Sequence, residues 1–138
     1  MFGKKSVEKS FTNLISRGTY VTGNIKFSGV IRIEGTVSGD VIVEADDENN
    51  RISGSVLICG GAEVYSDSVH AHDISIGGDG VAIVKSKKIW AENNLEILCG
   101  SQISNATIYY RNIRIEPGAM LHECVLKHLD YSSEGEQV

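Results

Sequence analysis

The sequence predicts an all-β, single-domain fold in which short parallel strands wind into a β-helix, a β-solenoid of roughly six three-sided turns. Two observations carry this prediction: a long alternation of apolar and polar residues punctuated by glycine, and a longer repeat of the same apolar segments. The chain has 138 residues, of which 41% are hydrophobic, so it is long enough to bury one core. We therefore expect one domain.

The alternation occupies the first part of the chain. From Val21 to Val43 every odd position is apolar or glycine, and nearly every even position is polar. Because successive side chains of a strand point to opposite faces, this pattern predicts extended chain with one buried and one exposed face. It is too long for one ordinary strand, so the recurring Gly23, Gly29 and Gly35 mark bends between short strands.

The longer repeat emerges when short apolar segments are aligned. Successive segments are offset by 25, 18, 21 and 18 residues. A repeat of this length suits three short sides per turn, and stacking the turns about 4.8 Å apart would line up like residues in apolar columns. The segments are Ile31–Ile33, Val56–Ile58, Ile74–Ile76, Leu95–Ile97 and Ile113–Ile115.

Three stretches interrupt this repeat. They are Asp46–Arg51, Gly77–Gly80 and Lys85–Lys88, and each is predicted to be a surface insertion. The register of the turns between residues 45 and 95 is accordingly left open.

The two ends of the chain lack the alternation. Residues 1–17 and 129–138 are rich in Ser, Lys and Glu, which predicts flexible N-terminal and C-terminal tails. The expected β-helix core is residues 18–128.

Charge and cysteine content limit the partners and the compartment. The formal net charge of −5 argues against nucleic acid, because phosphate binding requires clustered Lys and Arg. No apolar run of about 18 residues predicts a membrane-spanning helix, and no signal peptide is expected. Cys59, Cys99 and Cys124 form neither a disulfide framework nor a zinc motif, which favours a reducing cytoplasm.

Motifs for catalysis are not found in the sequence. It contains no recognisable nucleophile motif, no phosphate-binding glycine loop and no dinucleotide fingerprint. His70 and His72 are two residues apart and would point to one side of a strand, but a solvent-exposed pair explains them more simply than a metal site. We therefore expect no enzyme activity, no cofactor, no nucleotide and no metal.

The first residues have the composition of a weak membrane contact. Met1 and Phe2 are apolar, and Lys4 and Lys5 are basic. Such a short segment would hold a monomer only weakly on an anionic leaflet, whereas many copies on one polymer would raise the avidity strongly.

Several segments of the sequence resemble the bactofilins, a bacterial family of polymer-forming cytoskeletal proteins. The resemblance is carried by Gly18–Ile25, Phe27–Gly29, Ile31–Asp40 and Ile113–Ala119, and it covers about Gly18 to Leu126. It departs from the family pattern after Gly61–Val64, where Tyr65–Val69 replaces the usual glycine-containing step.

The resemblance implies a right-handed, three-sided parallel β-helix that polymerises without nucleotide through its two end faces. It further implies a scaffold in cell shape or localisation, in the cytoplasm at the inner face of the cytoplasmic membrane, with recruited cell-envelope proteins as possible partners. Some members begin with a membrane-targeting Met-Phe-x-Lys peptide, which Met1, Phe2, Lys4 and Lys5 match.

The residues themselves also favour end-to-end assembly. A solenoid exposes an unpaired coil at each end unless a cap covers it, and the sequence contains no amphipathic capping helix. Neighbouring subunits are therefore expected to contact apolar residues near both ends. These are Val21, Ile25, Phe27, Ile113, Ile115, Leu121 and Leu126.

Two other interpretations remain open. The six-residue spacing of Ile25, Ile31, Val37 and Val43 also suits a left-handed β-helix enzyme of the hexapeptide acyltransferase or γ-carbonic-anhydrase type. This is disfavoured because the six-residue spacing fails after Val43 and the histidines match no catalytic spacing. A non-polymerising adaptor would require capped ends.

Overall fold

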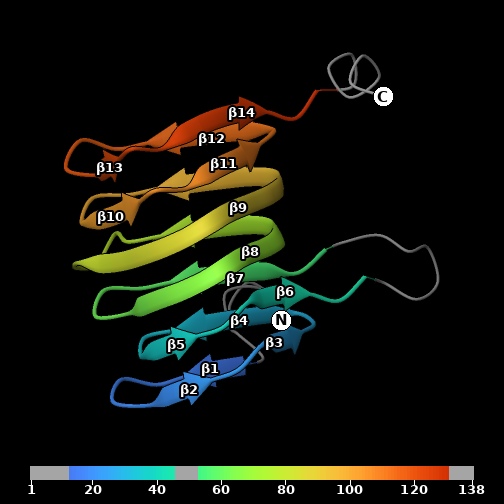
Figure 1. Cartoon of the computed structure of the whole chain (residues 1–138), viewed down its shortest axis with the longest axis vertical. Coiled ribbons are helices and arrows are strands. Elements are labelled where there is room, and N and C mark those ends of the chain that lie inside the picture. The colour runs from blue at the N-terminus through green and yellow to red at the C-terminus, as the bar shows by residue number, and fades with distance from the viewer. Residues whose placement is uncertain (1–12, 46–52, 131–138) are drawn as a thin grey trace, which may run out of the picture.

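Six stacked turns of parallel β-strands make up the molecule. The computed structural model describes residues 13–45 and 53–130, which form fourteen strands and contain no helix. Every strand pairing in this part of the chain is parallel, and the turns rise in sequence order from β1 to β14 (Figure 1). The predicted β-solenoid is confirmed.

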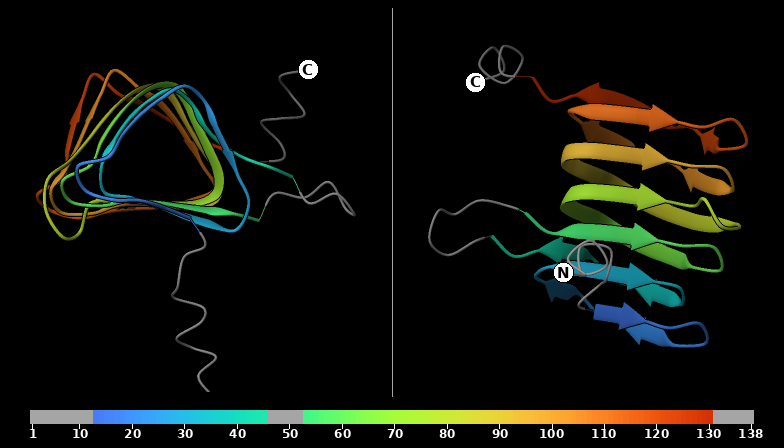
Figure 2. Two further views of the ribbon diagram at one scale, coloured as in Figure 1. Left: turned by 90° about the horizontal axis from the view of Figure 1, so that it is seen from below. Right: turned by 180° about the vertical axis from the view of Figure 1, so that it is seen from behind.

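The strands group into three faces, and the turns superpose in a three-sided outline when seen along the axis (Figure 2). The first face contains β1 (Asn13–Ile15), β4 (Val30–Ile33), β7 (Ser55–Ile58), the last part of β8 (Glu63–Ile76) and of β9 (Ala82–Ile97), and β12 (Asn112–Ile115). The second contains β2 (Tyr20–Thr22), β5 (Thr36–Ser38), the first part of β8 and β9, β10 (Ser101–Ser104) and β13 (Met120–His122). The third contains β3 (Ile25–Phe27), β6 (Val41–Val43), the middle of β8 and β9, β11 (Thr107–Tyr110) and β14 (Val125–His128).

The strand register reproduces the offsets read from the sequence. On the first face Ile31 pairs with Val56, Val56 with Ile74, Ile74 with Leu95, and Leu95 with Ile113. The middle register that the sequence left open is fixed on the second face, where Val64 pairs with both Val37 and Val84.

One isoleucine column runs through all six turns and shows how the core is built. Its members in the inner turns are 0–1% exposed, because each is covered by a like residue above and below. Full burial of such a side chain contributes roughly 1.5–3 kcal/mol before the ordering entropy is subtracted. The column is Ile15, Ile33, Ile58, Ile76, Ile97 and Ile115.

Two of the predicted insertions have different outcomes. Gly77–Gly80 lies between β8 and β9, as a connection should. Lys85–Lys88 does not interrupt the coil but belongs to β9, which continues round the corner between the second and third faces. The corner is closed by Ser86, which is 2% exposed and lies 2.6 Å, oxygen to oxygen, from the hydroxyl of Ser66. The third, Asp46–Arg51, lies outside the described residues.

Ordered structure extends into both segments that were expected to be tails. Residues 13–15 form β1, which pairs with β4 and buries Ile15 to 9%, although 1–17 was expected to be a tail. Three residues are too few for alternation to be detected. Leu129, expected in the C-terminal tail, is 5% exposed, and its backbone N–H donates to the Tyr110 carbonyl. The rest of both tails lies outside the described residues.

Candidate assembly surfaces

The N-terminal turn has one strand edge that no described strand covers. Here β1, β2 and β3 each pair with one strand, β4, β5 and β6 respectively. Val21 and Ile25 point inward but are only partly buried, whereas Val37 and Val41, their partners in the next turn, are 0% exposed. The sequence prediction for Val21 and Ile25 therefore coincides with an open apolar end.

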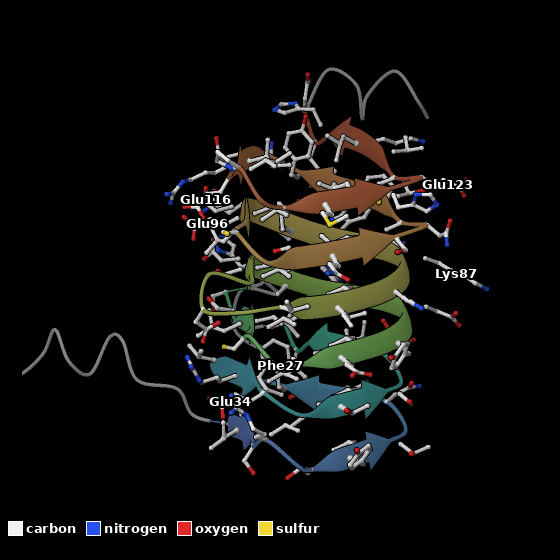
Figure 3. All side chains as sticks on the ribbon, turned by 90° about the vertical axis from the view of Figure 1, so that its left-hand side faces the viewer. Phe27, Glu34, Lys87, Glu96, Glu116 and Glu123 are labelled. Atoms are coloured by element: carbon white, nitrogen blue, oxygen red, sulfur yellow. The ribbon has the colours of Figure 1, made fainter. Side chains whose placement is uncertain are left out.

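Phe27 differs from Val21 and Ile25, because its side chain is covered within the subunit and offers little surface at this end. Its side chain is 4% exposed and belongs to the core (Figure 3). The ring uses the space that Gly54 leaves empty: a methyl group on Gly54 would lie 3.1 Å from Cε2 of Phe27 and 2.6 Å from Cγ2 of Val43. Phe27 therefore packs into the core beside Gly54, although it belongs to the terminal turn.

The C-terminal turn is open in the same way. Among the described strands, β12, β13 and β14 each pair with one strand, β9, β10 and β11. Ile115 and Leu126 are each 44% exposed, whereas Ile97 and Ile108, which they pair with one turn below, are 0% exposed. Ile113 and Leu121 are partly buried. All four predicted residues of this end therefore point inward and keep surface available.

Sequence reasoning missed further exposed apolar side chains on the two terminal turns. They occupy outward positions, where the alternation predicts polar residues. An apolar residue at such a position is the sequence feature that could have revealed them. They are Leu14 at 48%, Tyr20 at 79%, Met120 at 61% and Val125 at 52% exposed.

The corner between the first and second faces holds the most clearly perturbed ionisable groups. Arg32 donates to Glu34 at 2.6 Å, which raises the pKa of the guanidinium further above its usual value. Burial raises the pKa of the nearby Cys59 thiol, although the positive charge of Arg32 opposes the shift. The raised pKa leaves less thiolate at neutral pH, so Cys59 is a poor nucleophile here.

The two histidines considered as metal ligands form separate contacts. Nε2 of His70 lies 3.0 Å from Oε2 of Glu92, while Nδ1 of His72 lies 3.1 Å from Oδ2 of Asp73. A register shift between Ala71 and Asp73 also breaks the regular strand geometry on which the same-side prediction depended. Within residues 13–45 and 53–130, no three His, Cys, Asp or Glu side chains cluster as metal ligands.

The predicted membrane segment, Met1, Phe2, Lys4 and Lys5, lies outside the described residues. The described chain contains no helix that is long and apolar enough to span a bilayer.

Comparison with known proteins identifies the solenoid. The family model for bactofilins, described as polymer-forming cytoskeletal, matches residues 13–124. No curated protein and no solved structure matches the chain. The match begins at β1 and includes all or part of every turn, so it covers the same coils whose ends are open. The chain therefore belongs to the bactofilin family of polymer-forming cytoskeletal proteins.

Proposed function

We propose that this bactofilin is a scaffold that assembles without nucleotide by stacking its β-helices end to end. The filament would lie at the inner face of the cytoplasmic membrane, where it organises cell shape or localises recruited cell-envelope proteins. The family description supports the self-assembly, since it names a polymer-forming cytoskeletal domain.

The observation that carries the proposal is the exposure of inward-pointing side chains at both ends. Ile115 and Leu126 occupy core positions, yet 44% of each remains exposed. A further turn of another subunit would cover them and would pair the strand edge of β14. Assembly then continues the same column packing that stabilises the inner turns.

The test compares two arginine substitutions on one strand. Leu126→Arg places a charge at the inward position of β14, where a neighbouring subunit would bury it. We expect the critical concentration for filament formation to rise by at least about tenfold, because the variant loses the apolar contact and must also desolvate the charge on assembly. Negative-stain electron microscopy and sedimentation in nucleotide-free buffer measure this.

Val125→Arg is the matched control. Val125 is similarly exposed at 52% but points outward, so its substitution should leave the filaments intact. Filaments of Leu126→Arg that form at the wild-type concentration would contradict the proposal, provided that circular dichroism shows the same β-sheet signal in both variants.

Membrane association is tested by removing residues 1–5. The shortened chain should still form filaments but sediment much less with anionic liposomes, because it loses Met1, Phe2, Lys4 and Lys5 together. Sedimentation is measured against a filament-only control without liposomes. Undiminished liposome binding would contradict the membrane role of this segment.

A further inference from the structure

The third face of the solenoid differs in charge from the other two. Its paired strand segments place Lys26, Lys88 and Lys127 outward, and all three side chains are exposed. The outward positions of these segments contain no carboxylate. On a chain with a net charge of −5, this face is locally basic.

The other two faces are balanced. On the paired segments of the first face, the outward Arg32 and Arg114 are matched by Asp73 and Glu96. On the second face, Lys85 is matched by Glu63. The excess of positive charge is therefore specific to the third face and is not a general property of the surface.

Aromatic side chains lie between the lysines of the third face. The rings of Trp90 and Tyr109 stack with centroids 4.6 Å apart, and His70 meets Trp90 edge-on at 5.9 Å. Nζ of Lys88 lies 5.2 Å from the centroid of Trp90, and Nζ of Lys127 lies 5.9 Å from that of Tyr109. The outward column thus reads Lys26, Ile42, His70, Trp90, Tyr109 and Lys127.

Acidic groups flank this column just beyond the paired segments: at one edge Glu92 lies within β9, past its paired segment, and the exposed Glu44 directly follows β6. Oε2 of Glu92 accepts a hydrogen bond from the indole N–H of Trp90 at 2.9 Å and lies 3.0 Å from Nε2 of His70. The carboxylate therefore holds the ring ladder in place. At the other edge, Asp40 accepts backbone N–H bonds from Asp67 and Ser68.

We propose that the third face lies flat against an anionic membrane surface, an inference that rests on the membrane association proposed above. Trp and Tyr favour the interface between headgroups and hydrocarbon, and Lys is attracted to anionic lipid. The lysines belong to the first, fourth and sixth turns, so a planar partner contacts all of them at once. A filament would repeat this arrangement along its length.

The described chain starts on the first face, close to its corner with the third. Asn13, the first residue of β1, donates from its side-chain amide to the carbonyls of Ser28, which directly follows β3, and of Val30 in β4. The described chain therefore begins at the corner between the third and first faces.

The shape of the third face suits a bilayer better than a peptide partner. Shallow grooves occur on the first face, including one of about 230 Å³ lined by Ser55, Asp73 and Asn94. On the third face, by contrast, neighbouring rings cover one another, and a row of side chains on a sheet suits an extended plane.

The experiment uses the full chain and vesicles of phosphatidylcholine with or without phosphatidylglycerol. Trp90 is the only tryptophan, so its emission reports directly on the third face. With anionic vesicles the emission should shift to the blue, and with neutral vesicles it should not. The double variant Lys88→Gln, Lys127→Gln should bind anionic vesicles at least about tenfold more weakly while still forming filaments.

The matched control is Lys85→Gln, Lys87→Gln, which removes the same charge from the second face and its corner. If both double variants lose the same affinity, binding follows net charge and the proposal is wrong. It is equally overturned if the protein sediments with anionic vesicles while the Trp90 emission stays constant, or if only polyglutamate shifts that emission. The latter result would assign the face to an acidic protein partner.

These outcomes are separable from a failure of the N-terminal segment. Removal of residues 1–5 tests that segment alone, whereas the lysine variants keep it. Binding that survives removal of residues 1–5 but is lost in Lys88→Gln, Lys127→Gln would show that the third face binds the membrane and that residues 1–5 do not. Binding that is lost on removal of residues 1–5 but survives in the lysine variant would show that residues 1–5 bind the membrane and that the third face does not.

Discussion

A single inward residue has different consequences in an inner turn and in a terminal one. Ile97 and Ile115 are neighbours in one column, yet the first is 0% and the second 44% exposed. The residue type is identical, so the difference comes entirely from whether another turn lies above it. Burial in this fold is a property of stacking and not of the individual side chain.

The cysteines provide a residue-scale prediction. Cys59 is buried and its thiol pKa is raised, whereas Cys99 is exposed. Since the thiolate is the reactive form, Cys59 should react with iodoacetamide at pH 8 at least about tenfold more slowly than Cys99. Variants that retain one of the two thiols, followed by mass spectrometry, measure the rates.

Raising the pH should accelerate the Cys59 reaction, because more of its thiol ionises as the pH approaches the raised pKa. In urea the two rates should become similar, since unfolding exposes both. Equal rates in the folded protein would contradict the burial of Cys59.

At the scale of the element, the approach of neighbouring turns depends on glycine. Gly39 has a φ of 154°, and a methyl group added there would overlap the carbonyl oxygen of Gly23 in the turn below. Gly39→Ala should therefore force the first and second turns apart and destabilise the protein by about 1–3 kcal/mol. Denaturant unfolding in the Leu126→Arg background, where we expect no filaments, measures this.

Gly23→Ala separates the clash from backbone strain. Gly23 also has a positive φ, 123°, but nothing lies within 4 Å of its added methyl group. It should cost less than Gly39→Ala. Equal free-energy losses would show that the contact between the turns contributes nothing.

The pairing of some strands can be predicted from the sequence, and that of others cannot. The Ile31 and Val56 segments were aligned correctly because their apolar pairs recur with little variation. The register in β8 and β9 was left open because these strands bend round corners without a glycine, using Ser66 and Ser86 instead. Strand β1 was missed because three residues show no period.

The residues of the two open ends, like the strands, were predictable in part. Alternation marks which residues point inward, and position in the chain marks the terminal turns. Together they single out Ile115 and Leu126, whose inward side chains are each 44% exposed. Phe27 satisfies both criteria but is buried, because its ring fills the space beside Gly54. That packing joins residues far apart in the chain, and no local pattern encodes it.

At the scale of the whole molecule, end-to-end stacking predicts the axial repeat of a filament. Six turns spaced about 4.8 Å apart give a subunit rise of about 29 Å. Diffraction from aligned filaments should show a strong meridional reflection near 4.8 Å and a subunit repeat of about 29 Å, or about twice that value if alternate subunits point in opposite directions. A repeat unrelated to these lengths would show that the subunits do not stack turn on turn.

The parallel pairing of turns has a mechanical consequence. Because the backbone hydrogen bonds run along the solenoid axis, a pull along that axis loads all bonds of one turn together. The three faces share the force, so no single strand can be peeled away first. A filament of such subunits would therefore resist stretching, while the three faces of each solenoid remain free to bind. The tensile strength of the filament would be set by the weakest junction between turns.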